Sequence, residues 1–472
     1  MSSDAAPRRR RRRILIGLGV LVLLFGGAVA VFFATREGNV SNPNVEFRAE
    51  PSPTPAPSEA PTKGKPAADP FAITWPMYGV GEDRRRYFSV PGNLHGPFKK
   101  KWVFDGGALL EFPPVLQDNS IYVLSDEGVF FRIDKRTGKT LYRKKLGTLA
   151  AATPALAGDK VFVTVLTRAG SSGGRMVAMD AKTGKIEWSK DQSSRTESSP
   201  LVADGNVYFG TESGTVYALR QSDGKQLWTF RAAGSVKGGL ALKDGKLVFG
   251  DYAGAAYAIS EQTGKQIWQA KTKGANFGLR AGRFYATPAI AYGRVYLGNI
   301  DGYVYSFSLE TGQLAWRTQT GGYVYASAAI GPGPGGRPSV FTGSYDGRFY
   351  AMDAQSGKTL WTYGGGSKIS GPAQILSDTV YFADLGHRRV VGLDVRSGKQ
   401  IFTYPKGGFA PVITDGQTIY LTGYGAIYAL QPQSTYNKPK PKPRATPDPT
   451  QKAIAAFAGI LGRHARTNHK KH

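Results

Sequence analysis

One pattern of hydrophobic and polar positions recurs through the middle of the chain. A short alternating run leads into a glycine turn, and a second run follows that ends in an aromatic residue. Alternation with period two is typical of β-strands, and glycine permits the positive φ that a tight hairpin requires. Each copy therefore predicts a β-hairpin. The seven copies are FRIDKRTGKTLY (131–142), VAMDAKTGKIEW (177–188), YALRQSDGKQLW (217–228), YAISEQTGKQIW (257–268), YSFSLETGQLAW (305–316), YAMDAQSGKTLW (350–361) and VGLDVRSGKQIF (391–402).

The spacing of these hairpins predicts a larger unit. Their turn glycines lie 40 to 48 residues apart, from Gly138 to Gly398. An earlier glycine turn such as Ser213-Gly214 recurs in five of the units, after an alternating strand such as residues 206–210. Four short strands in about 40 residues is the size of one blade of a β-propeller.

The two ends of the repeat region complete one further blade. Residues 409–433 contain strands but no Gly-Lys hairpin, whereas residues 99–104 form an orphan strand with Trp102. Joining them leaves no free sheet edge and ties the ring shut. The sequence therefore predicts an all-β, eight-bladed propeller of four-stranded antiparallel blades over residues 75–433.

The aromatic residue that closes each unit is expected to be structural. Six of the seven tryptophans stand at this position. A large ring at a repeated position predicts packing between neighbouring blades, against small residues such as Ala218 and Ala258. The eight aromatic positions are Trp102, Tyr142, Trp188, Trp228, Trp268, Trp316, Trp361 and Phe402.

The N-terminal region predicts a membrane anchor. Residues 1–13 form a basic cytoplasmic segment with six arginines, and residues 14–34 follow with 21 residues free of charge. As a helix this segment is about 31 Å long, enough to cross a bilayer, and the positive-inside rule places the arginines in the cytoplasm. We therefore expect a single-pass protein of the plasma (inner) membrane with an extracytoplasmic propeller. A cleaved signal peptide ending near Ala28-Val29-Ala30 is the competing interpretation.

Two segments of biased composition flank the predicted propeller. Residues 35–74 are rich in proline, alanine and serine, which predicts an extended linker. Residues 434–472 form a basic tail that we expect to be mostly disordered. The chain carries a net charge of +27, and both termini contribute to it. We interpret the remaining charge as a basic surface and expect no specific nucleic-acid partner.

The repeated Ala-x-Asp-x-x-Thr-Gly-Lys-x-x-Trp unit resembles the tryptophan-docking repeat of pyrroloquinoline-quinone (PQQ) type propellers. The resemblance covers residues 98–433, and Trp75-Pro-Met-Tyr-Gly79 is similar to the lead-in of bacterial members. It implies eight blades and either of two functions, because the family includes quinoprotein alcohol dehydrogenases and non-enzymatic BamB-type proteins. The dehydrogenases hold PQQ and Ca²⁺ in the central channel.

Composition argues against several catalytic chemistries. The chain has no cysteine, which excludes disulfides, thiolate metal sites and an acylated cysteine anchor. The predicted propeller contains only His95 and His387, so a histidine triad or zinc site is not expected. We predict no catalytic residues, no metal site and no cofactor; PQQ with Ca²⁺ belongs to the enzymatic alternative alone.

Loops that join the blades are the best candidates for a binding surface. In propellers, the loop from each fourth strand to the next blade lines the mouth of the channel. Mixed charge combined with tyrosine is typical of surfaces that bind peptides or polar ligands, although these residues could also simply cap the blade ends. The candidate residues are Glu111, Glu197, Lys237, Arg280, Arg283, Tyr285 and Tyr325.

These features favour a non-catalytic scaffold. We expect a membrane-anchored, monomeric propeller, held at the membrane by residues 14–34, that binds proteins or envelope polymers in the manner of BamB-type proteins. The alternatives are a PQQ-dependent quinoprotein oxidoreductase and an extracellular ligand sensor. Fold class cannot choose among these functions.

Overall fold

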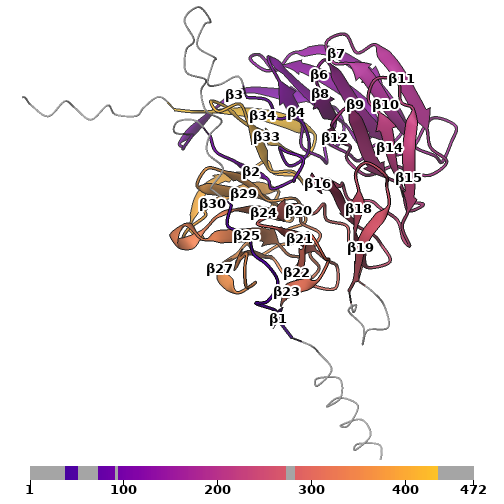
Figure 1. Cartoon of the computed structure of the whole chain (residues 1–472). Helices are drawn as coiled ribbons and strands as arrows, with labels where there is room; N and C mark the ends of the chain where they lie inside the picture. The colour runs from indigo at the N-terminus through magenta and orange to yellow at the C-terminus, as the bar shows by residue number, and fades with distance from the viewer. Residues whose placement is uncertain (1–37, 51–72, 91–93, 273–281, 434–472) are drawn as a thin grey trace, which may run out of the picture. The chain divides into compact units, whose positions relative to one another are not determined.

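A computed structural model describes residues 38–50, 73–90, 94–272 and 282–433. Its strands form eight sheets, each built on four antiparallel strands. In seven of the sheets these four strands are consecutive in the chain, and two sheets take a fifth strand from the segment before the blades. The prediction of an all-β, eight-bladed propeller is confirmed. Figure 1 shows the blades succeeding one another from purple to yellow along the chain. The chain divides into two compact units, Met1–Gln431 and Pro432–His472, and only two residues of the second are described.

The first four blades are hairpin pairs of similar length, in which a three-residue inner strand is followed by three longer strands. The first blade is β4 (Val115–Gln117), β5 (Ser120–Leu124), β6 (Val129–Asp134) and β7 (Thr140–Lys145). The second is β8 (Ala155–Ala157), β9 (Lys160–Val165), β10 (Arg175–Asp180) and β11 (Ile186–Asp191). The third is β12 (Leu201–Ala203), β13 (Asn206–Gly210), β14 (Thr215–Arg220) and β15 (Gln226–Arg231). The fourth is β16 (Ala241–Lys243), β17 (Lys246–Gly250), β18 (Ala255–Ser260) and β19 (Gln266–Lys271).

The next three blades keep this plan. The fifth is β20 (Ala289–Ala291), β21 (Arg294–Gly298), β22 (Tyr303–Ser308) and β23 (Leu314–Gln319). The sixth is β24 (Ala329–Pro332), β25 (Pro338–Gly343), β26 (Arg348–Asp353) and β27 (Thr359–Gly364), with the short 3₁₀ helix η1 (Pro334–Gly336) between its first two strands. The seventh is β28 (Gln374–Leu376), β29 (Thr379–Asp384), β30 (Arg389–Asp394) and β31 (Gln400–Tyr404).

The eighth blade joins the two ends of the repeat region. Strands β32 (Val412–Thr414), β33 (Ile419–Thr422) and β34 (Ala426–Pro432) pair with β3 (Phe98–Asp105) as the outer strand. In Figure 1 the purple β3 lies beside the yellow β34. The sheet therefore unites the two segments that the sequence analysis expected to close the ring.

The repeated aromatic residue has a defined place in each hairpin. In six hairpins it pairs across the hairpin with a small residue ten positions earlier, as Trp228 does with Ala218, and a β-bulge follows that pair. In the first blade, Tyr142 pairs with Arg132 instead. The ring then covers the turn of the next blade, where Trp188 lies against Gly224 and its indole N–H donates to the carbonyl of Gln221 at 2.9 Å. Six indoles donate one such hydrogen bond each to the following blade, and Tyr142 does so through its hydroxyl. These hydrogen bonds join seven of the blades to the blade that follows.

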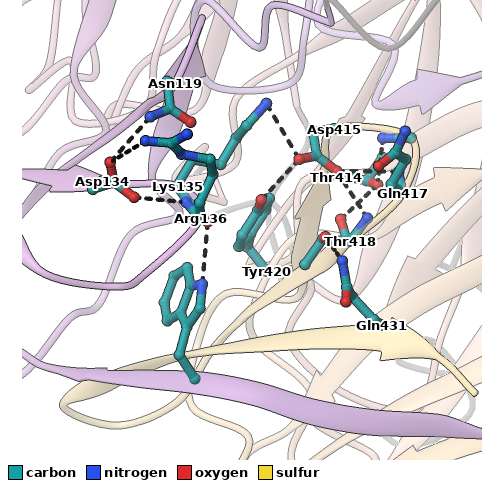
Figure 2. A network of polar contacts seen from close by, with 12 residues as sticks. Asn119, Asp134, Lys135, Arg136, Thr414, Asp415, Gln417, Thr418, Tyr420 and Gln431 are labelled. Carbon is teal, nitrogen blue, oxygen red and sulfur yellow. Dashed lines mark hydrogen bonds and ion pairs between the residues drawn. The ribbon is translucent and has the colours of Figure 1, made fainter.

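A polar network stabilises the junction between the closing blade and the first blade. Asp415 accepts a hydrogen bond from the Tyr420 hydroxyl at 2.8 Å and lies 3.3 Å from the ammonium of Lys135 (Figure 2). Asp134, next to Lys135, accepts from the side-chain amide of Asn119 at 3.0 Å. These contacts join the last blade of the ring to the first.

Part of the predicted linker belongs to the propeller. Strand β1 (Val40–Ser41) adds to the outer edge of the fifth blade by pairing with β23, and Val45 is buried. Glu50 pairs with Arg85 at 2.8 Å and with Lys243 at 2.6 Å. For residues 38–50 the expectation of an extended linker is wrong, because an unpaired sheet edge and two cations bind the segment.

The predicted N-terminal segments lie outside the described residues. This holds for residues 1–13 and 14–34 and for most of the linker, and the basic tail, residues 434–472, lies outside them as well. Within the described ranges, no helix has the length and hydropathy needed to span a membrane.

Candidate binding site at the channel mouth

One segment from before the propeller crosses the central channel. We call residues 73–90 the channel plug; it includes β2 (Tyr87–Phe88), which pairs in parallel with the inner strand β28. Inner strands of a propeller have one edge free, and the plug carbonyls satisfy N–H groups on these edges. Trp75 exchanges two backbone hydrogen bonds with Leu116 of the first blade. Five other blades each donate one backbone N–H hydrogen bond to a plug carbonyl, from Leu156, Leu242, Ile290, Ile330 and Ile375.

Two arginines of the plug are fully buried on the channel axis. Arg84 donates to the carbonyls of Leu240 at 2.9 Å and Pro200 at 3.0 Å, and also to that of Tyr78. Arg86 donates to Ala328 at 2.9 Å. Burial, followed by the charge of Arg86, lowers the pKa of Arg84 to about 9. Both residues adopt positive φ, a conformation that non-glycine residues rarely take. Arg86 also donates to the carbonyl of Thr287 at 3.3 Å, so hydrogen bonds to the loops of four blades hold the two arginines there.

Hydroxyl groups link neighbouring blades above the plug. The backbone N–H of Thr153 donates to the Ser199 hydroxyl at 3.0 Å. In the same way, the backbone N–H of Gly239 donates to the Thr287 hydroxyl at 2.9 Å, and the backbone N–H of Thr287 donates to the Ser327 hydroxyl at 3.0 Å. These residues immediately precede the inner strands, and they form a throat whose polar groups are paired.

A pocket of about 350 Å³ lies at the mouth of the channel. Loops from successive blades form its wall, and Tyr78 of the plug contributes to its lining from the inner side. We call it the mouth pocket. Five of the seven candidate residues line it together: Glu111, Glu197, Lys237, Tyr285 and Tyr325. The structure therefore brings these five residues together at one face of the ring.

The other two candidate residues lie elsewhere. Arg283 is beside the pocket, with its guanidinium 5.6 Å from the centre of the Tyr252 ring. Arg280 lies outside the described residues.

Charge pairing in the mouth pocket is uneven. The ammonium of Lys237 lies 3.0 Å from Glu197 and 2.8 Å from Glu212. Burial disfavours this ammonium, but the hydrogen bonds to the two glutamates outweigh burial and raise its pKa. Tyr285 donates to Glu197 at 2.7 Å, and burial together with that carboxylate raises the pKa of its hydroxyl.

Glu111 differs from these residues in lacking a partner. It makes no hydrogen bond or ion pair with any described residue. Burial raises the pKa of its carboxyl, and the neighbouring charges of Glu197 and Asp126 raise it further.

Aromatic rings continue from the pocket to the exposed rim. The rings of Tyr325 and Tyr345 are 4.8 Å apart, and Lys368 lies 5.5 Å above Tyr345. At the rim, Tyr323 is 53% exposed and Tyr424 is 46% exposed. The mouth therefore presents large, partly exposed rings beside cations.

Sequence reasoning missed four features of this site. Tyr78, Arg84 and Arg86 precede the repeat, and Tyr345 stands in a turn inside a blade rather than in a loop between blades. The lead-in motif around Trp75 was the available signal for the plug. Within the described part of the chain, no group of three or more His, Asp or Glu side chains is arranged to hold a metal ion.

The closed ring of eight blades and its aromatic residues docked on glycine turns define a PQQ-repeat β-propeller. The chain belongs to the family described as outer membrane protein assembly factor BamB, whose repeats match residues 94–229, 163–362 and 301–435. These matches together span residues 94–435, more than half of the 472 residues.

Similar proteins include both an enzyme and a BamB protein. Quinohemoprotein alcohol dehydrogenase ADH IIB of Pseudomonas putida is 32% identical over 117 residues, which are 21% of this chain and only 16% of that protein. The structure of BamB from Moraxella catarrhalis has a TM-score of 0.57 at 17% identity, over 71% of this chain and 99% of that one. Quinohemoprotein alcohol dehydrogenase from Comamonas testosteroni has a TM-score of 0.63 at 15% identity, over 76% and 80%. Identities this low establish the fold alone.

Proposed function

We propose that this protein is a non-catalytic, membrane-anchored scaffold whose channel mouth binds proteins of the cell envelope. The observation that carries the proposal is the combination of a plugged channel with an aromatic mouth. The plug leaves a pocket that is open at the loop end, and the exposed rings of Tyr323 and Tyr424 extend the surface beyond it. Partly exposed tyrosines on a rigid frame are typical anchors of protein interfaces. The BamB family assignment supports protein partners in general.

The residues of the mouth pocket do not fit pyrroloquinoline quinone. That cofactor carries three carboxylates, so a site for it needs cations. The lining offers two carboxylates, Glu111 and Glu197, and one ammonium, Lys237, which already bridges two glutamates. Repulsion by the unpaired Glu111 opposes the binding of a polyanion. This charge pattern supports the scaffold over the dehydrogenase.

The sequence relationship to a quinohemoprotein alcohol dehydrogenase favours the second candidate, a PQQ-dependent oxidoreductase. Calorimetric titration of the full chain with the quinone, with and without Ca²⁺, separates the two functions. The scaffold predicts no saturable heat and no dye-linked oxidation of alcohols. Calcium-dependent binding at micromolar quinone, accompanied by dye reduction, would establish the dehydrogenase instead.

Site-specific photo-cross-linking in intact cells tests the docking surface directly. A photoreactive phenylalanine analogue would replace Tyr323 at the mouth or, as a matched control, Ile401 on the outer strand β31. Both positions are 53% exposed. We expect discrete protein adducts from position 323 and none from position 401. Equal adducts at both positions, or none at position 323, would contradict docking at the mouth.

The proposal includes an orientation relative to the membrane. In this topology the hairpin turns between first and second strands lie at the end of the ring opposite the mouth. Residues 48–50 reach the propeller at such a turn, where the N–H of Arg48 donates to the carbonyl of Tyr292 at 3.0 Å. Asn39 is nearer to the predicted anchor, and its side chain accepts from the N–H of Gln319, the last residue of β23, at 2.8 Å. An anchor at residues 14–34 would therefore join the molecule at the outer edge of the fifth blade.

A further inference from the structure

One carboxylate in the mouth pocket lacks a counterion. Glu111 follows the closing strand β3 and lines the pocket, and the two charges that act on its carboxyl are the carboxylates of Glu197 and Asp126. The one ammonium in the lining, that of Lys237, is held by Glu197 and Glu212. The described lining thus carries one uncompensated negative charge in a chain whose net charge is +27. A partly buried carboxylate without a partner is unfavourable, so a pocket that retains one is suited to a cation.

The walls around this carboxylate are aromatic. The lining includes Phe112 and Phe409 besides the tyrosines, and the Tyr285 and Tyr325 rings meet edge to face at 5.8 Å. Ring faces attract cations and also bury apolar groups. The hydroxyl of Ser370, which is buried and unpartnered in the described structure, adds a polar atom to the lining. A metal ion would need several oxygen ligands, whereas an ammonium ion needs one carboxylate and a few acceptors.

We propose that the mouth pocket binds an organic ammonium ion whose charged group pairs with Glu111 and whose apolar part lies against the aromatic rings. The cavity of about 350 Å³ is within the range of small-molecule sites. The same chemistry is available from a free amine or from a lysine side chain of a docked protein. The inference rests on the proposed function, which places the binding surface at the channel mouth.

Calorimetry on the full chain with matched probes tests this proposal. The cationic probe is 2-phenylethylamine, the neutral probe is 2-phenylethanol and the anionic probe is 3-phenylpropionate. We expect saturable binding of the amine and at least about tenfold weaker binding of the alcohol and the acid, because only the amine gains a charge-assisted contact. Equal affinity for the amine and the alcohol, or no saturable binding of the amine, would overturn the proposal.

Two variants locate the charge. Glu111→Gln keeps the shape of the side chain and removes its charge, and it should weaken amine binding by at least about tenfold while leaving the alcohol unchanged. Glu127→Gln is the matched control, because Glu127 lies in the first blade, which directly follows the loop of Glu111, but is exposed and outside the lining. It should change amine affinity less than about twofold. Thermal melting of both variants verifies folding, and an unchanged amine affinity in folded Glu111→Gln would contradict the role of Glu111.

A further probe identifies the source of the ammonium group. Tighter binding of Nα-acetyl-lysine methylamide than of 2-phenylethylamine would support a lysine side chain of a partner, and the reverse order would support a small amine. Failure of the amine titration together with cross-links at position 323 would refute this inference and leave protein docking intact. Amine binding without cross-links would support the pocket and refute protein docking.

Discussion

At the scale of the residue, the turn glycines have two separate reasons to be glycine. Gly224 has φ of +70°, and a Cβ at this position would lie 2.6 Å from the ring of Trp188. Gly205 has φ of +75° but nothing within 4 Å of the same point. Glycine is therefore required at position 224 by both the backbone conformation and the docked ring, whereas position 205 requires it for the backbone conformation alone.

Substituting these two glycines separates the two effects. Gly205→Ala should lower the free energy of unfolding by about 1 kcal/mol, the usual penalty for a side chain at positive φ. Gly224→Ala should lower it by a further ~1–3 kcal/mol, because the methyl group displaces the docked indole. Chemical denaturation of both variants measures the difference. Equal losses would show that the ring can move aside without penalty.

The unpaired carboxyl of Glu111 should make stability depend on pH. Burial, with the charges of Glu197 and Asp126, raises its pKa in the folded state. A raised pKa means that the favourable protonated form is present at low pH and that its stabilisation is lost as pH rises through the folded pKa. Glu111→Gln should therefore raise the melting temperature at pH 7.5 more than at pH 4.5. A gain that is the same at both pH values would contradict the raised pKa, and Glu127→Gln should show no gain.

At the scale of the element, the plug acts through its arginines. Arg84 is fully buried and donates to carbonyls of the plug and of loops from two different blades. Its planar group presents donors in several directions at once, which an ammonium cannot reproduce. The arginine therefore connects separate elements that have no covalent link at the axis.

Substitution of Arg84 should be costly whether or not the charge is kept. Arg84→Met leaves three carbonyls without their donor and should destabilise the protein by about 3–5 kcal/mol. Arg84→Lys should recover only a minor part of that loss, because one ammonium cannot reach all three carbonyls. Equilibrium unfolding in urea measures both. Full recovery by lysine would mean that charge alone, rather than the geometry of the guanidinium, holds the plug.

The closing blade provides a second test at this scale. Lys135 and Asp415 are 3.3 Å apart and join the first blade to the last. In a double-mutant cycle with Lys135→Met and Asp415→Asn, we expect a coupling of about 1 kcal/mol, since the pair is largely buried. Unfolding free energies of the four proteins give this value. A coupling energy near zero would mean that β-sheet pairing and aromatic contacts alone close the propeller.

At the scale of the whole molecule, attachment and folding are predicted to use different segments. The predicted anchor ends before residue 38, whereas residues 38–50 pack on the propeller through β1 and Glu50. Replacing residues 1–37 with a cleavable secretory signal should therefore release a soluble propeller of unchanged melting temperature. Cell fractionation and thermal melting measure the two effects.

The same experiment separates the anchor from the alternative of a natural signal peptide. The unaltered protein should sediment with membranes and retain its N-terminal residues. Recovery of the unaltered protein in the soluble extracytoplasmic fraction would show that the segment is cleaved. Extending the replacement to residue 50 should lower the melting temperature, because it removes β1 and the ion pairs of Glu50.

The repeat could be predicted from the sequence because its determinants are local. Period-two alternation, a glycine turn and an aromatic residue ten positions after a small residue all lie within one hairpin, as in Ala218 to Trp228. Seven copies reinforced one another, and the incomplete copies at the two ends predicted the eighth blade. Loop position then predicted that Glu111, Glu197 and Tyr285 would approach one another at the mouth.

The character of the mouth pocket was decided only by tertiary structure. The plug lies outside the repeat, so no pattern placed Tyr78 in the pocket or buried Arg84 and Arg86 on the axis. The sequence likewise could not show that Lys237 would pair with Glu197 and Glu212 and leave Glu111 without a cation. Strand and turn formation depend on neighbours within a few residues, whereas burial and charge pairing depend on side chains that meet only when the ring closes.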